Sequence, residues 1–190
     1  MPRLFSNILL HLLLVLLAAF WLVGCSDEAN DPNPKVQKLA KLLGSQISSL
    51  SELVHAPLSN DNPKAVQAVL ASFFLKCSQT GQALENSVVV LDEHGVTFAE
   101  RDPAPGHPEG VSIRSSARDY SSYHIIRKTL KSGRTEVGVV YLPHDKFYVV
   151  CHPVGETKPV GVLVLGILGS YLETRLGMSG QDFLDMQINS

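Results

Sequence analysis

The sequence of 190 residues lacks the motifs that identify most metalloproteins and many enzymes. It has three cysteines and seven histidines, without the CxxC, CxxCH or HExxH spacing of zinc and haem sites. It has no GxSxG elbow, P-loop or SxxK motif, and its acidic residues form no recognisable acid–base pair. Cys151 and His152 are neighbours, but adjacent residues of one strand point to opposite faces and cannot act together as nucleophile and base. We therefore expect a protein that is not an enzyme and binds no metal or cofactor.

An excess of positive charge is also missing. The chain has 16 Lys and Arg residues against 18 Asp and Glu residues, a formal net charge of −2. Without a basic stripe to neutralise phosphates, we expect no nucleic-acid partner. No internal repeat is visible, and the length suits one domain with a hydrophobic core.

The N-terminus carries the longest apolar run, from Ile8 to Val23, after a single positive residue, Arg3. This run is short for a transmembrane helix, which needs roughly 20 apolar residues. It ends in Leu22-Val23-Gly24-Cys25, which resembles the lipobox of bacterial lipoproteins. The resemblance implies a signal peptide over 1–24, cleaved before Cys25, whose thiol and freed amine then carry fatty acyl chains such as palmitate. The alternative is an uncleaved anchor helix with Cys25 as an ordinary cysteine.

Residues 25–34 are polar and contain two prolines, so they are expected to form a flexible tether between the lipid and the domain. Lipid on Cys25 would hold the protein in a bacterial cell envelope, facing the periplasm. Ser26 rather than an aspartate follows the cysteine. By resemblance to enterobacterial sorting, this favours the outer membrane over the inner membrane.

The periodicity of the remaining chain predicts an α+β domain over 35–178, followed by a tail over 179–190. Apolar residues at helical spacing predict two helices within 35–83, the first ending near Pro57 and the second starting near Pro63 with Asn62 among its cap residues. Strands are expected over 87–92, 96–100, 136–142, 146–153 and 160–168, a helix over 122–131, and a short helix in the tail. A hairpin, a helical crossover and a three-stranded meander within 87–168 form a five-stranded antiparallel sheet, with the N-terminal helices packed on one side. This is a PAS-like arrangement.

Three segments resemble the extracytoplasmic Cache family of sensor domains: VVVLDEHGVTFAE from Val88, SARDYSSYHIIRKTLKSGR from Ser116, and YVVCHPVGETKPVGVLVLGI from Tyr148. The resemblance covers roughly Val88 to Ile167. It implies a PAS-like fold that binds a small molecule between the sheet and the crossover segment. No kinase, cyclase or methyl-accepting segment follows in the sequence, so we expect signalling through a membrane or periplasmic protein partner.

Arg118 falls in the crossover segment by its match to the family motif. A guanidinium can hold a carboxylate by two parallel hydrogen bonds, which suits an organic acid or an amino acid. The alternative is a solvated surface arginine beside Asp119. Tyr120 and Tyr123 could form walls of the same pocket, or Tyr123 could be partly buried in the core.

Three residues of the sheet are further candidate ligand contacts: Tyr141, Tyr148 and His152. Alternation places Tyr148, Val150 and His152 on one face of their strand and Phe147, Val149 and Cys151 on the other, and the pattern leaves open which set faces the ligand. His152 could also titrate as a pH sensor.

Cys77 and Cys151 remain after lipidation of Cys25 and could form one disulfide in an oxidising compartment. Taken together, the sequence predicts a lipid-anchored domain that binds a small molecule and signals through a partner. The alternative is a structural or adaptor lipoprotein that binds another envelope protein and no small molecule. A third possibility is a redox or haem sensor with a reducible bridge between Cys77 and Cys151.

Overall fold

Two helices begin the part of the chain that the structure describes. A computed structural model describes residues 33–80, 87–101, 118–141, 146–155 and 157–188. The lipobox, the tether up to residue 32 and residues 102–117 lie outside these residues. Pro34–Ser190 groups as one compact unit, and within the described ranges no helix is both long and apolar enough to cross a membrane.

The first helix, α2, spans Pro34–Ser59, and the second, α3, spans Pro63–Gln79. The backbone N–H of Ala65 donates to the side chain of Asn62 at 3.1 Å, so Asn62 is the expected N-cap of α3. The first helix runs about one half-turn further than predicted, because it continues through Pro57 in its last turn. We attribute this to the next residue, Leu58, which is buried in the core and favours continuation of the helix.

The five strands form one antiparallel sheet in the order β2-β1-β5-β4-β3, which confirms the predicted fold class. Their bounds are β1 Ser87–Asp92, β2 Thr97–Arg101, β3 Glu136–Tyr141, β4 Lys146–Val154 and β5 Gly161–Leu168. The long crossover between β2 and β3 contains the helix α4, His124–Ser132, which ends at the left-handed Gly133.

The hairpin between β1 and β2 turns at Gly95, whose φ of +81° favours glycine. The Asp92 carboxylate accepts hydrogen bonds from the backbone N–H groups of His94 and Val96, both at 2.9 Å. This Asx-type bonding explains why the strand ends at an aspartate.

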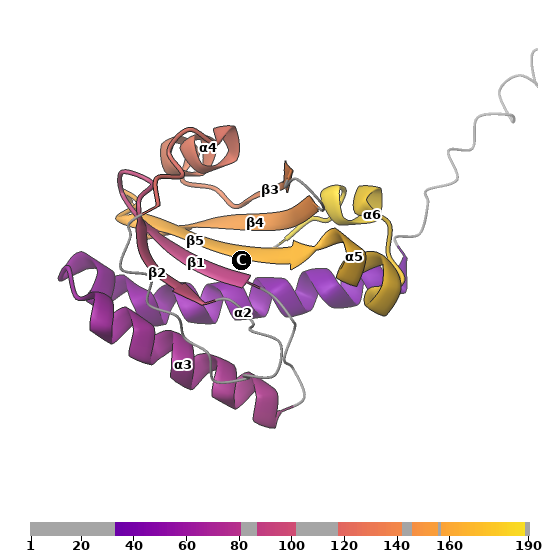
Figure 1. Cartoon of the computed structure of the whole chain (residues 1–190), viewed down its shortest axis with the longest axis horizontal. Coiled ribbons are helices and arrows are strands. Elements are labelled where there is room, and N and C mark those ends of the chain that lie inside the picture. Colours follow the sequence, from indigo (N-terminus) through magenta and orange to yellow (C-terminus); the bar gives the residue numbers. More distant parts are fainter. Residues whose placement is uncertain (1–32, 81–86, 102–117, 142–145, 156, 189–190) are drawn as a thin grey trace, which may run out of the picture. The chain divides into compact units, whose positions relative to one another are not determined.

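The two faces of the sheet are covered differently (Figure 1). Helices α2 and α3 lie on one face, where they build the larger hydrophobic core with inward side chains such as Val88, Val150 and Leu165. We call this the packed face. Helix α4 lies over the other face, which carries a smaller apolar cluster that includes Leu91, Val149 and Val162.

The chain after β5 returns to the packed face through α5 (Gly169–Tyr171), the π-helical turn η1 (Leu172–Leu176) and α6 (Gly180–Leu184). Phe183 of α6 is fully buried, and its ring centroid lies 5.5 Å from that of Tyr148. A capping box between Ser179 and Asp182 starts α6. The short docked helix predicted for the tail is therefore present.

Candidate functional site

A cavity of about 620 Å³ lies between the sheet and the crossover segment with α4. Its described lining comes from all five strands and from the crossover: Ser87, Val89, Leu91, Glu100, Arg118, Asp119, Tyr120, Tyr123, Ile125, Ile126, Val140, Phe147, Val149, Cys151, Val164 and Gly166. We call the face of the sheet that bears these strand residues the cavity face. A cavity of this size is typical of small-molecule sites.

The floor of the cavity is apolar because alternate residues of each strand point to it. On β4 these are Phe147, Val149 and Cys151, and on β5 they include Val164 and Gly166. A Cβ atom at Gly166 would lie 2.9 Å from the Phe147 ring, so glycine leaves room for that ring. The sequence left open which face of β4 meets a ligand. In the structure, the face with Phe147, Val149 and Cys151 lines the cavity.

Arg118, Asp119 and Tyr120 form the polar end of the cavity. Backbone hydrogen bonds between the crossover and the β1–β2 hairpin hold this end in place. The N–H of Thr97 donates to the carbonyl of Arg118 at 2.8 Å, and the N–H of Tyr120 donates to the carbonyl of Gly95 at 2.9 Å. An isolated bridge joins Val96 and Asp119. These bonds fix the backbone from which three of the lining side chains project.

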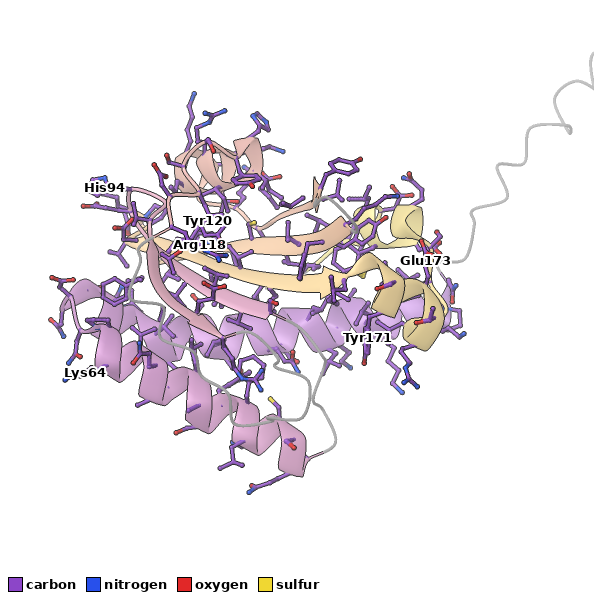
Figure 2. All side chains as sticks on the ribbon, in the orientation of Figure 1. Lys64, His94, Arg118, Tyr120, Tyr171 and Glu173 are labelled. Atoms are coloured by element: carbon purple, nitrogen blue, oxygen red, sulfur yellow. The ribbon has the colours of Figure 1, made fainter. Side chains whose placement is uncertain are left out.

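Arg118 and Tyr120 lie together on the α4 side of the sheet, whereas Lys64 and Tyr171 lie on the packed side (Figure 2). The ring of Tyr120 is 5.9 Å from that of Tyr123, and the two planes are inclined by 39°. Tyr123 also precedes α4 as its N-cap residue and is 39% exposed. The structure thus brings Arg118, Tyr120 and Tyr123 to one cavity.

Asp119 adds a carboxylate to this end of the cavity. It accepts a hydrogen bond from the backbone N–H of Ser121 at 2.7 Å. Hydrogen bonds from Ser121 lower the pKa of Asp119, so its carboxylate is ionised at neutral pH.

Glu100 is the lining residue that the sequence analysis missed. It pairs with Val89 of β1, shares the cavity face with it, and is only 4% exposed. The sequence offered no clear signal, because the pairing that places Glu100 on the same face as Val89 depends on a register shift between Val90 and Leu91 that the structure shows. A buried glutamate is rare enough to indicate a specific role.

The prediction that Tyr141, Tyr148 and His152 contact the ligand must be corrected. All three lie on the packed face of the sheet, and none of them lines the cavity. Tyr148 packs against Phe183 in the larger core, and Tyr141 at the end of the edge strand is 73% exposed. His152 lies half-buried with Nδ1 2.8 Å from the hydroxyl of Thr135, and burial lowers its pKa. Strand alternation alone could not reveal this, since both faces of β4 are apolar.

The predicted disulfide is wrong, because Cys77 and Cys151 are both free thiols. Cys151 points to the cavity face, whereas Cys77 lies on α3 at the packed face, so the sheet separates them. Burial raises the pKa of both thiols, most strongly that of Cys151. The described ranges also contain no group of three or more His, Cys, Asp or Glu side chains that could hold a metal ion.

No protein-family model matches the sequence, and no curated protein matches it either. Among solved structures, the extracellular domain of a protein described as a histidine kinase, vpHK1S-Z8, is similar with a TM-score of 0.53 and 16% identity, over 78% of this chain. This chain spans 59% of the length of that structure. A domain of a protein described as of the sensory box/GGDEF family, from Vibrio parahaemolyticus, aligns with a TM-score of 0.47 and 15% identity, over 78% of this chain and 67% of that one. The first likeness shows that the chain has the α+β fold of that extracellular domain.

Proposed function

We propose that this protein is an extracytoplasmic lipoprotein whose PAS-like, Cache-type domain binds a small molecule and reports it to a partner protein. The observation that supports the proposal best is the cavity on the α4 side of the sheet, with Arg118 and Tyr120 at its polar end. A site with apolar walls and a few convergent polar groups is typical of ligand binding. The similar fold of an extracellular domain from a protein described as a histidine kinase adds support.

The ligand proposed is of the organic acid or amino acid type. Arg118 can hold a carboxylate by two charge-assisted hydrogen bonds, and the hydroxyls of Tyr120 and Tyr123 can add further ones. Val89, Val149 and Val164 offer apolar contacts to the rest of the molecule.

The signalling step is proposed to need a membrane or periplasmic partner. Acyl chains on Cys25 would insert into one leaflet only, so ligand binding must be passed on by contact between proteins. The outer membrane is the proposed location, by the sorting resemblance at Ser26.

Binding can be tested by thermal shift with a panel of carboxylates, amino acids and amines. A true ligand should raise the melting temperature of the wild-type protein, because it binds the folded state. Arg118→Ala should weaken the shift for a carboxylate ligand, whereas Arg175→Ala, at an exposed arginine on η1, should leave it unchanged. If no compound in the panel changes the melting temperature and a partner protein co-purifies with the wild-type protein, the adaptor function replaces the sensor function.

The lipid anchor can be tested separately with Cys25→Ser. We expect this variant to incorporate no labelled palmitate and to leave the membrane fraction, because stable attachment needs two or more acyl chains. Normal processing and membrane fractionation of the variant would contradict the lipoprotein assignment.

A further inference from the structure

We infer that the cavity takes a ligand with an elongated hydrocarbon body, such as a medium-chain monocarboxylate, and discriminates against short acids and diacids. This inference rests on the proposed function of the cavity and narrows its ligands from organic acids in general to amphiphilic ones. Val140 and Phe147 are then specificity-determining residues.

The cavity extends across the whole sheet. Its described lining includes residues of all five strands, from Glu100 of the edge strand β2 to Val140 of the opposite edge strand β3. Neighbouring strands lie about 4.8 Å apart, so the four spacings between these two strands amount to about 19 Å. A cavity lined from one edge of the sheet to the other is elongated, and a short acid such as acetate would fill only a small part of it.

The cavity face leaves apolar surface of the inner strands uncovered. Leu163 and Leu165 of the central strand β5 are 0% and 1% exposed, whereas Val164 between them, which lines the cavity, is only half-buried. On the neighbouring strand β1, Val89 is likewise half-buried at the cavity. A hydrocarbon chain or ring in the cavity would remove this surface from water, which favours binding in proportion to the apolar area covered.

The cavity is most apolar where it lies over β3 and β4. Val140 and Phe147, which are paired across these two strands, line it there, and Ile125 of α4 packs over Gly138 on the same face of β3. The described lining from β3, β4 and β5 contains no charged residue and no hydroxyl group; those groups come from β1, β2 and the crossover. A hydrocarbon body placed over β3 and β4 therefore meets hydrocarbon. A second charged group at this place would lose hydration and meet no charged partner in the described lining of these strands.

Calorimetric titration of the full chain with matched acids tests the inference. Butyrate, hexanoate and octanoate share one carboxylate and differ only in chain length, so the ratio of their affinities reports on the body alone. Adipate is hexanoate with a second carboxylate at its far end. The chain is held in a bile-salt detergent, which has no alkyl chain to occupy the cavity. We expect binding to tighten about fourfold per methylene, or roughly 200-fold from butyrate to octanoate, and adipate to bind at least about tenfold more weakly than hexanoate.

Substitutions on β3 test whether the hydrocarbon body lies over that strand. Val140→Thr replaces a methyl group by a hydroxyl group of similar size, and it should weaken octanoate binding by about tenfold while changing butyrate binding little. Val139→Thr is the matched control, because Val139 is the half-buried neighbour on the same strand and packs against the larger core. It should leave the affinities for both acids unchanged, and uptake of the acids by micelles cancels in the comparison. If Val140→Thr does not fold, Phe147→Leu removes part of the same apolar lining and should likewise weaken octanoate binding more than butyrate binding.

Butyrate binding as tightly as octanoate, adipate binding as tightly as hexanoate, or undiminished octanoate binding in the cavity variants would overturn the inference while leaving a small-molecule site in place. Failure of all four acids, when another compound of the thermal-shift panel binds, would have the same meaning. Failure of all four acids together with a flat thermal-shift panel would instead overturn the proposed function and the inference with it. The two failures are therefore distinguishable.

Discussion

The two faces of the sheet are built from the same strands and have similar apolar side chains, but they are used differently. On the packed face, two helices of 26 and 17 residues cover the strands and fill the space between them with side chains. On the cavity face, the covering helix among the described residues is α4, with nine residues, and a cavity of about 620 Å³ lies between it and the sheet. The comparison teaches that an apolar strand face becomes core where side chains from covering helices fill the space above it, and becomes a candidate binding site where a cavity is left.

The largest expected change in the free energy of unfolding comes from substitutions at two neighbouring valines of β4. Val150 points into the packed face and Val149 lines the cavity, so Val150→Ala and Val149→Ala remove the same methyl groups from opposite faces. We expect Val150→Ala to lower the free energy of unfolding by about 2 to 3 kcal/mol, because it creates a new void in a filled core. Val149→Ala should lower it by about 1 kcal/mol, since that side chain already borders empty space.

Urea unfolding of the two variants and the wild type measures this difference directly. Equal losses in the two variants would show that the cavity face is as tightly packed as the other face. Unchanged m values in all three proteins are the control for two-state behaviour.

A smaller loss of stability is expected from a substitution at the contact between α4 and the sheet. A Cβ atom at Gly138 of β3 would lie 2.6 Å from Cδ1 of Ile125, a residue of α4 that lines the cavity. Gly138→Ala should therefore displace the end of Ile125 and cost about 1 kcal/mol of stability, near the low end for overpacking because a side-chain end can move.

The same substitution should change ligand affinity more than Arg175→Ala does, because it alters a cavity wall. The measurement is the melting temperature with and without the best ligand from the panel. An unchanged ligand-induced shift would indicate that α4 adjusts without altering the cavity.

The smallest effect is expected at His152, which is not on the cavity face. Burial lowers its pKa in the folded state from the ordinary value of 6.5, so the unfolded chain binds the proton more strongly. The stabilisation from this residue is present above pH 6.5 and is lost as pH falls below that value, toward the lower pKa of the folded state. Because the side chain is partly exposed, the change should be below about 0.5 kcal/mol.

His152→Gln should remove this part of the pH dependence, as measured by urea midpoints at about pH 5 and about pH 8. Ligand affinity of the variant should follow the wild type, since the ring is absent from the cavity lining. A loss of ligand binding in this variant would return His152 to the list of ligand contacts.

Most of the fold could be predicted from the sequence, because the periodicity of apolar residues and the turn residues specify local structure. The strand expected over 87–92 is β1, and the helix expected over 122–131 contains α4, His124–Ser132, apart from its last residue. The end of α2 was missed by two residues, because local proline chemistry was outweighed by the burial of Leu58.

The site could be predicted only in part. Arg118, Tyr120 and Tyr123 came from a motif resemblance, and the structure places all three at the cavity. Tyr148 and His152 could not be assigned to a face, because both sides of β4 are buried and alternation gives no sign of which side has the cavity. The separation of Cys77 from Cys151 likewise depends on which face each occupies, which is tertiary information.

At the end of β2, Glu100 and Arg101 occupy successive positions, with Glu100 at the cavity and the Arg101 guanidinium 3.9 Å above the Phe74 ring of α3. Side chains alternate strictly along a strand, so a pairing slip of one residue would exchange the two charges between the faces. The polarity of the cavity thus depends on the order of these two adjacent residues. The contact between the Arg101 guanidinium and the Phe74 ring stabilises the register that places Glu100 at the cavity.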